Sequence, residues 1–191
     1  IFTPANSMLS RTGTSGISWG TTVNPHSGAD DAFVAKLNGN GVLQWNTFLG
    51  GADTDWGQHI AVDTSGNVYV TGYCGATWGT PINPFSGGGD GFVAELDGNG
   101  VRQWNTFLGG TDFDIAYGIA VGTSGNVYVT GYGAATWGTP VNPFSGGGDA
   151  FVAELDGNGV RRWNTFLGGT NSEYGVGIAV DIGGNLFVIG D

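Results

Sequence analysis

Apolar and polar side chains alternate along short runs of the sequence, and segments rich in glycine, asparagine and aspartate separate these runs. Residues 92–96 and 101–108 flank Asp97-Gly98-Asn99-Gly100, whose residues tolerate positive φ and favour a tight hairpin turn. Residues 118–121 and 126–130 flank a second turn-rich segment and are rich in β-branched and aromatic residues. The pattern therefore predicts two hairpins, or four short strands, in each unit.

This pattern returns at a constant step of 59 residues. Equivalent segments begin at Asp31, Asp90 and Asp149, so residues 1–191 are interpreted as a single repeat domain with a partial repeat at each terminus. Four antiparallel strands per unit predict an all-β fold of tandem, four-stranded β-propeller-type blades, about three 59-residue repeats in all. Closed propellers typically have four to eight blades, so we expect neighbouring chains to complete the array.

The two ends of the chain carry copies of one strand segment, with Ser10 and Arg11 where Tyr69 and Val70 stand in the next repeat. Counting units from Asn67 makes the C-terminal copy the first, unpaired strand of a fourth unit. Natural proteins seldom leave such an apolar edge open, so we expect it to add to another copy of the chain. Self-association would give a filament, or a ring if the rotation closes. The predicted assembly residues are Leu9, Ser10, Arg11, Leu186, Phe187, Val188 and Ile189.

Three sequence blocks recur in order within each unit, and in one unit they span residues 31–37, 45–51 and 60–72. They read DAFVAKL, WNTFLGG and IAVDTSGNVYVTG. This order resembles the family of bacterial β-propeller repeats, including the type found in seven-bladed propellers. The resemblance implies a propeller-type blade in an extracellular or cell-surface protein of bacteria, and it implies no catalytic residues.

Composition agrees with a turn-rich array. The chain has 39 glycines among 191 residues, only 5 lysines and arginines, and a net charge of −11. This charge disfavours nucleic acid and anionic membrane surfaces as partners, and no apolar run is long enough for a spanning helix. The chain starts at Ile1 without a basic-then-apolar leader, which fits either a processed mature form or an excerpt of a longer protein.

Little in the sequence indicates catalysis. His26 and His59 have no histidine at the equivalent positions of other repeats, and Cys74 is the only cysteine. No nucleophile, base or metal constellation recurs with the repeat, so we predict a protein that is not an enzyme and has no catalytic residues.

Acidic residues that follow a Gly-Gly pair are candidate ligands for Ca²⁺, which prefers oxygen ligands. The alternative is that these side chains cap turns and keep the surface soluble. Calcium is the one cofactor that the sequence suggests. The candidate residues are Asp53, Asp55, Asp112, Asp114 and Glu173.

One tryptophan per repeat lies in a loop beside glycine and proline, at Trp19, Trp78 and Trp137. An aromatic face on a loop can stack on a sugar, which suggests a glycan-binding module. The alternative is that each ring packs against the neighbouring blade. Two functions therefore remain from the sequence: a structural protein that self-associates, and a glycan- or ligand-binding propeller module.

Overall fold

The computed structural model describes residues 13–191, which form thirteen strands and no helix. Leu9, Ser10 and Arg11 lie outside the described residues. The strands are β1 (Thr14–Ser15), β2 (Asp31–Leu37), β3 (Leu43–Leu49), β4 (Asp55–Val62), β5 (Val68–Cys74), β6 (Asp90–Leu96), β7 (Arg102–Leu108), β8 (Asp114–Val121), β9 (Val127–Gly133), β10 (Asp149–Leu155), β11 (Arg161–Leu167), β12 (Gly175–Val180) and β13 (Leu186–Gly190).

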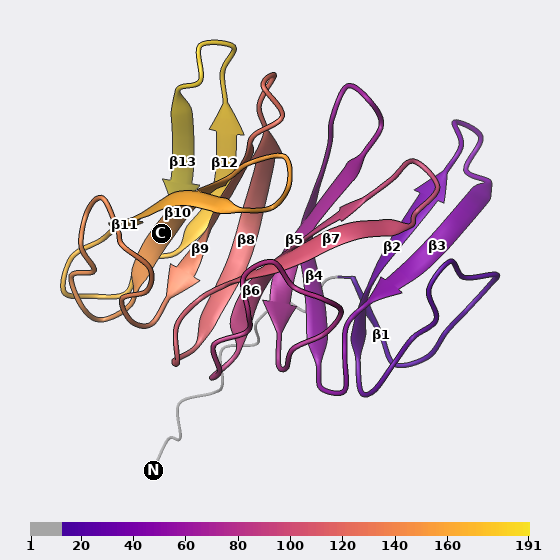
Figure 1. Cartoon of the computed structure of the whole chain (residues 1–191), viewed down its shortest axis with the longest axis horizontal. Helices are drawn as coiled ribbons and strands as arrows, with labels where there is room; N and C mark the ends of the chain where they lie inside the picture. The colour runs from indigo at the N-terminus through magenta and orange to yellow at the C-terminus, as the bar shows by residue number, and fades with distance from the viewer. Residues whose placement is uncertain (1–12) are drawn as a thin grey trace.

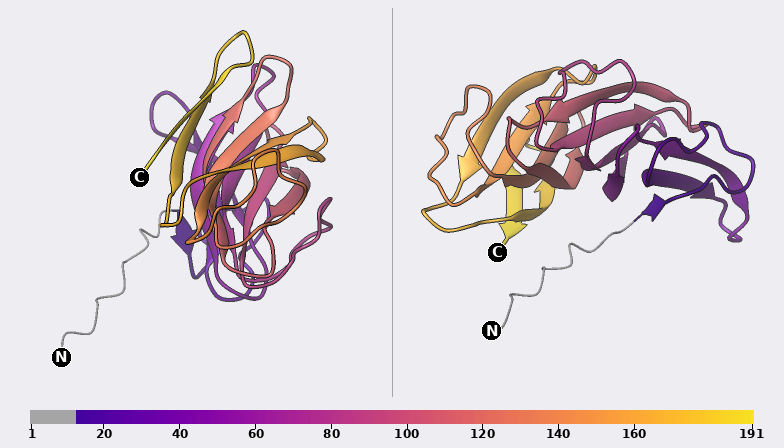
Figure 2. Two further views of the ribbon diagram at one scale, coloured as in Figure 1. Left: turned by 90° about the vertical axis from the view of Figure 1, so that its left-hand side faces the viewer. Right: turned by 90° about the horizontal axis from the view of Figure 1, so that it is seen from below.

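The strands form four separate antiparallel sheets. Two are complete four-stranded blades, in the orders β4-β5-β6-β7 and β8-β9-β10-β11. A three-stranded sheet, β1-β2-β3, precedes them and a two-stranded sheet, β12-β13, follows. The sheets follow one another along an open arc, with the two incomplete sheets at its opposite ends (Figures 1 and 2). The predicted all-β fold of four-stranded, propeller-type blades is confirmed.

The blade boundary differs from the one predicted. A complete blade starts at β4, not at the segment that follows Asn67, and residues 75–89 connect two strands of one sheet. The C-terminal copy, β13, is therefore the second strand of its sheet, and Leu186 pairs with Val180 of β12. The prediction of an unpaired first strand was wrong because a repeat period gives the length of a unit but not the point at which the unit begins.

Apolar side chains between successive sheets form the core. One cluster joins Tyr69 and Val93 of the first complete blade to Ile119 and Val127 of the second. A similar cluster joins Val34 on β2 to residues of the first complete blade. The apolar faces are thus buried by neighbouring blades, as expected for a repeat array.

Burial at equivalent positions changes at the N-terminal end of the array. Ile119 on β8 is 2% exposed, whereas Ile60, 59 residues earlier on β4, is 49% exposed. Both face the preceding sheet, but the sheet before Ile60 contains only β1, β2 and β3 among the described residues. The first interface is therefore incomplete where the second is closed.

The two isoleucines provide a matched test of this packing. We expect Ile119→Ala to lower the free energy of unfolding by about 2–5 kcal/mol, because it removes fully buried methylene groups and leaves a cavity. Ile60→Ala in dilute protein should cost much less, since half of the side chain is already in water. Urea unfolding followed by tryptophan fluorescence gives both values. Equal losses would contradict the assigned interfaces.

Candidate functional site

Two equivalent pockets lie between successive sheets, and we call them the inter-blade pockets. The first, of about 190 Å³, lies between the loop that contains Asn24 and Pro25 and the start of β7 at Arg102. The second, of about 240 Å³, lies between the loop that contains Asn83 and Pro84 and the start of β11 at Arg161. The same structural elements form both, so the repeat of the sequence produces a repeat of the site.

A fixed guanidinium group lines each pocket. In the first, Arg102 Nη1 donates to Asn105 Oδ1 at 2.6 Å, and Arg102 Cζ lies 5.5 Å from the centre of the Trp78 ring. Asn105 is held in turn by the bond from its Nδ2 to Trp78 O, at 3.0 Å. Gly79, at φ +66°, completes the cradle, because a Cβ there would overlap Arg102 Nη1. The loop therefore requires glycine at this position.

The second pocket repeats this arrangement. Arg161 Nη1 donates to Asn164 Oδ1 at 2.5 Å, and its Cζ lies 5.5 Å from the ring of Trp137. Burial lowers the pKa of Arg102 and of Arg161, but each guanidinium remains charged near neutral pH. Neither arginine has a carboxylate partner among the described residues.

The loop tryptophans lie mainly in the core. Trp78 and Trp137 are 7% and 6% exposed. Trp78 makes edge contacts with Phe92 and Phe107 at ring distances of 5.3 and 5.8 Å. Trp19, in the first repeat, is half-buried and contacts Phe33. This arrangement favours the packing alternative over an open aromatic face for sugars.

The candidate calcium ligands separate into two environments. Asp53 and Asp112 are exposed on loops, whereas Asp55 and Asp114 are each 1% exposed at the start of β4 and β8. Glu173 is half-buried and accepts from the backbone of Gly169. Residues 13–191 hold no group of three or more histidine, cysteine or acidic side chains arranged for a metal ion. Calcium binding stays a prediction.

The structure adds carboxylates that the sequence analysis missed. Asp31, Asp90 and Asp149 begin equivalent strands and are at most 1% exposed. A Cβ on Gly109 would lie 2.7 Å from Asp90 Oδ1 and 2.8 Å from Asp114 Oδ2, so these carboxylates approach each other across the blade interface. In the sequence, the one sign of these buried carboxylates was that an aspartate recurs at a 59-residue step. This sign is weak, because aspartate is common in the turns that precede strands.

Asp90 and Asp114 each accept a hydrogen bond from the backbone of a nearby loop. Asp90 Oδ2 accepts from the backbone N–H of Ser86 at 2.7 Å, and Asp114 Oδ2 accepts from that of Gly110 at 2.7 Å. Among the described residues, Asp90 Oδ1 and Asp114 Oδ1 are buried without a hydrogen-bond partner. Burial raises the pKa of Asp55, Asp90 and Asp114 to about 7, against the stabilising backbone bonds. These carboxylates therefore stabilise the loops through their hydrogen bonds, but burying their charge opposes folding.

The remaining candidate chemistry stays isolated. Cys74 is a buried free thiol whose pKa is raised, chiefly by burial, which makes it a poor nucleophile. His26 Nε2 contacts Ala29 O at 2.8 Å, and His59 is exposed on β4. Within residues 13–191, no hydrogen bond joins either imidazole ring to a serine, threonine or cysteine side chain.

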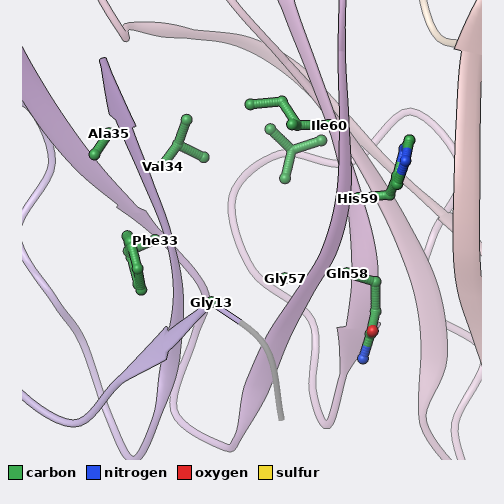
Figure 3. Close-up of a pocket in the computed structure, with 9 residues that line it drawn as sticks. Gly13, Phe33, Val34, Ala35, Gly57, Gln58, His59 and Ile60 are labelled. Atoms are coloured by element: carbon green, nitrogen blue, oxygen red, sulfur yellow. The ribbon is translucent and has the colours of Figure 1, made fainter. Parts of the chain in front are cut away.

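A third hollow marks the incomplete N-terminal interface. It has a volume of about 190 Å³ and lies between β2 and β4. Val34 and Ile60 face this gap (Figure 3), and Val70 also lines it. The equivalent residues of the next interface, Val93, Ile119 and Val129, all belong to one buried cluster. Among residues 13–191, this interface is therefore less completely packed than the next one.

Two sheet edges are also open among the described residues. β1 pairs with β2 only through Thr14 and Ser15, and Gly13 O accepts from Phe33 N at 2.8 Å. Beyond Phe33, no described residue pairs with that edge of β2. At the other end of the arc, β13 pairs with β12 on one side only. Residues 13–191 contain no helix of the length and apolar character needed to cross a membrane.

Repeated four-stranded blades, aligned at a constant step, define an open array of propeller type. The family model described as "Beta-propeller repeat" matches residues 44–83, which extend from β3 into the loop after β5. The resemblance to β-propeller repeats is therefore confirmed over residues 44–83.

Two curated proteins are similar to the chain. "Regulatory protein FlaEY" of Caulobacter vibrioides is 34% identical over 144 residues, which cover 71% of this chain and 15% of that protein. "Uncharacterized WD repeat-containing protein L264" of Acanthamoeba polyphaga mimivirus is 27% identical over 189 residues, which cover 82% of this chain and 13% of that protein. The chain thus spans a small part of the length of both relatives.

The buried carboxylates predict a stability that depends on pH. A pKa of about 7 in the folded state exceeds the value near 4 in the unfolded chain, so folding takes up protons between these values. The free energy of unfolding should increase as the pH falls from about 8 to about 5. Urea unfolding at a series of pH values measures this dependence.

Asp114→Asn should flatten this pH dependence, because it removes one of the groups that take up a proton. Asp112→Asn, two residues away on the exposed loop, is the matched control and should change the profile much less, because its charge is the smallest of the effects on the pKa of Asp114. A parent protein that loses stability on mild acidification would contradict the assignment, as would identical profiles for the parent and Asp114→Asn.

Proposed function

We propose that this chain is a non-enzymatic structural module that assembles with further copies of itself through its open blade edges. The observation that carries the proposal is the match between the hollow at the N-terminal interface and the exposed strand β13. We place the module outside the cell or at the cell surface, because the resemblance to bacterial β-propeller repeats implies such proteins. The chain covers only 15% and 13% of the length of its two relatives, so the proposal concerns this module.

The register of the complete blades gives the geometry of the contact. β5 pairs with β6 so that Tyr69 lies opposite Glu95 and Thr71 lies opposite Val93. At the repeat step, β13 corresponds to β5 and β2 corresponds to β6. Pairing β13 of one copy with β2 of the next would therefore place Phe187 opposite Lys36 and Ile189 opposite Val34. The result would be a complete blade in the order β12-β13-β2-β3.

Phe187 has the shape and position to fill the hollow. It stands at the position of Tyr69, whose ring belongs to the same buried cluster as Val93 and Ile119. In the single chain, Phe187 is 62% exposed and Ile189 is 72% exposed. Strand addition would bring Phe187 toward Val34 and Ile60. The exposed apolar side chains of β13 would then be buried in the hollow of the next copy.

The contact is heterologous, because one edge of the chain meets a different edge of its neighbour. Such a contact repeats without limit unless the rotation closes it into a ring. Both the filament and the ring of the sequence prediction use the same interface. Light scattering and negative-stain images of the native particle distinguish them.

A single substitution tests the interface. Phe187→Ser introduces the residue that stands at the equivalent N-terminal position, Ser10. Because Phe187 is mostly exposed in the single chain, the variant should retain its melting temperature in dilute solution while its particle mass falls to that of one chain. Phe151→Ser, which alters a fully buried ring, should instead destabilise the chain itself.

Cross-linking tests the register independently. Phe33 N donates to Gly13 O, so on this edge of β2 the neighbouring Val34 should occupy a closely spaced, non-hydrogen-bonded position. In a Cys74→Gly background, mixing Val34→Cys with Ile189→Cys chains should give a disulfide-linked pair on a non-reducing gel. Leu37→Cys mixed with Ile189→Cys is the out-of-register control. A particle of one chain at all concentrations, without cross-linking, would refute the proposal.

A further inference from the structure

We propose that the two inter-blade pockets bind the carboxylate of an acidic sugar, one uronic acid residue in each pocket. The observations that support this are a preformed guanidinium, a polar cavity around it and the repetition of both. The pockets are separate from the open edges at the two ends of the array, so this inference does not depend on self-association.

The guanidinium groups are placed for an anion that the chain does not supply. The described part of the chain holds four basic side chains, and two of them, Arg102 and Arg161, line the pockets. By contrast, Arg162 pairs with Asp156 at 2.6 Å and Lys36 Nζ donates to Gly98 O at 3.1 Å. In a chain of net charge −11, two half-buried arginines without a carboxylate partner indicate a binding role.

The first repeat shows that the arginine is not required for the fold. Leu43 stands at the position of Arg102, and Asn46 stands at that of Asn105. Asn46 Nδ2 still donates to Trp19 O at 2.7 Å, while Asn46 Oδ1 is buried without a partner. The loop therefore keeps its asparagine bond with leucine in place of arginine. One arginine N–H satisfies the asparagine, and the guanidinium has further donors for a ligand.

The geometry fixes the guanidinium before a ligand arrives. The hydrogen bond to Asn105 and the contact with the Trp78 ring hold Arg102 in one position. Gly79 has no Cβ and so leaves room for the guanidinium. Little side-chain entropy is then lost on binding, and a planar guanidinium suits a two-oxygen carboxylate. The opposite wall is formed by Asn24, Pro25 and Ser27. Asn24 Nδ2 already donates to Thr47 Oγ1 and Ser27 Oγ to Asp31 Oδ2, so the oxygens of these side chains can accept from sugar hydroxyls.

Size and repetition favour a sugar acid over a larger anion. Cavities of about 190 and 240 Å³ hold a single small ring rather than a drug-sized ligand. The two pockets have equivalent lining residues, so each should take one sugar acid. The net charge of the chain repels long polyanions, so we infer a short acidic oligosaccharide or the exposed end of one.

Calorimetry with trigalacturonic acid tests the inference, in buffer with excess chelator so that no cation bridges sugar and protein. The parent chain should bind it, and the fully methyl-esterified trimer should not bind, because uncharged methyl esters replace its carboxylates. Monomeric galacturonic acid should saturate two sites per chain. Absence of binding by the parent, or equal binding of the ester, would overturn the inference.

The matched variants come from the repeats themselves. Arg102→Leu with Arg161→Leu introduces the leucine of the first repeat and should weaken binding by about tenfold or more, because charge-assisted hydrogen bonds are lost. Arg162→Gln removes the same charge outside the pockets, and glutamine stands at that position in the other repeats, as Gln44 and Gln103. This control should bind like the parent.

The single variant Arg102→Leu keeps the test decisive should the double variant fold poorly. It should reduce the number of galacturonate sites from two to one, with unchanged affinity at the remaining site. Retention of two sites, or equal loss of binding in Arg162→Gln, would refute recognition by the pocket arginines. Binding of inorganic phosphate without binding of galacturonate would refute the assignment to a sugar acid.

Discussion

The structure depends on the burial of each blade against the next. A four-stranded sheet has two apolar faces, and neither face can be covered within the sheet itself. The cluster that contains Tyr69, Val93 and Ile119 shows what a completed interface contains. The preceding sheet has only β1, β2 and β3 among residues 13–191, and the equivalent Ile60 is half in water. The interface between blades, rather than the blade, is therefore the unit of stability.

The same interface produces the candidate chemistry. Asp90 and Asp114 meet across it, and Gly109 leaves the space between them. The inter-blade pockets also form there, with a loop of one sheet facing an arginine of the next. A blade in isolation would have half of each site. The candidate sites and the packing of the blades therefore depend on the same kind of interface.

Much of the fold could be predicted from the sequence because it depends on local signals. The glycine- and asparagine-rich turns and the alternation of the strands indicate hairpins, and the constant step indicates identical units. The starting point of a blade could not be predicted, since a periodic sequence has no internal origin. Only the pairing of β5 with β6 across residues 75–89 shows that this long loop lies within a sheet.

The sequence by itself determined the fold class, the repeat length and the residues that recur. It also identified the loop tryptophans and Asp55, Asp114 and Glu173 as residues to examine. The tertiary structure decided their surroundings, because burial and proximity arise from segments far apart in the chain. It placed Trp78 in the core, brought Asp90 to Asp114, and left Arg102 beside a polar cavity without a carboxylate. Arginine stands at this position in two repeats and leucine in the first, so the sequence did not single it out, and only the facing blade shows the cavity beside it.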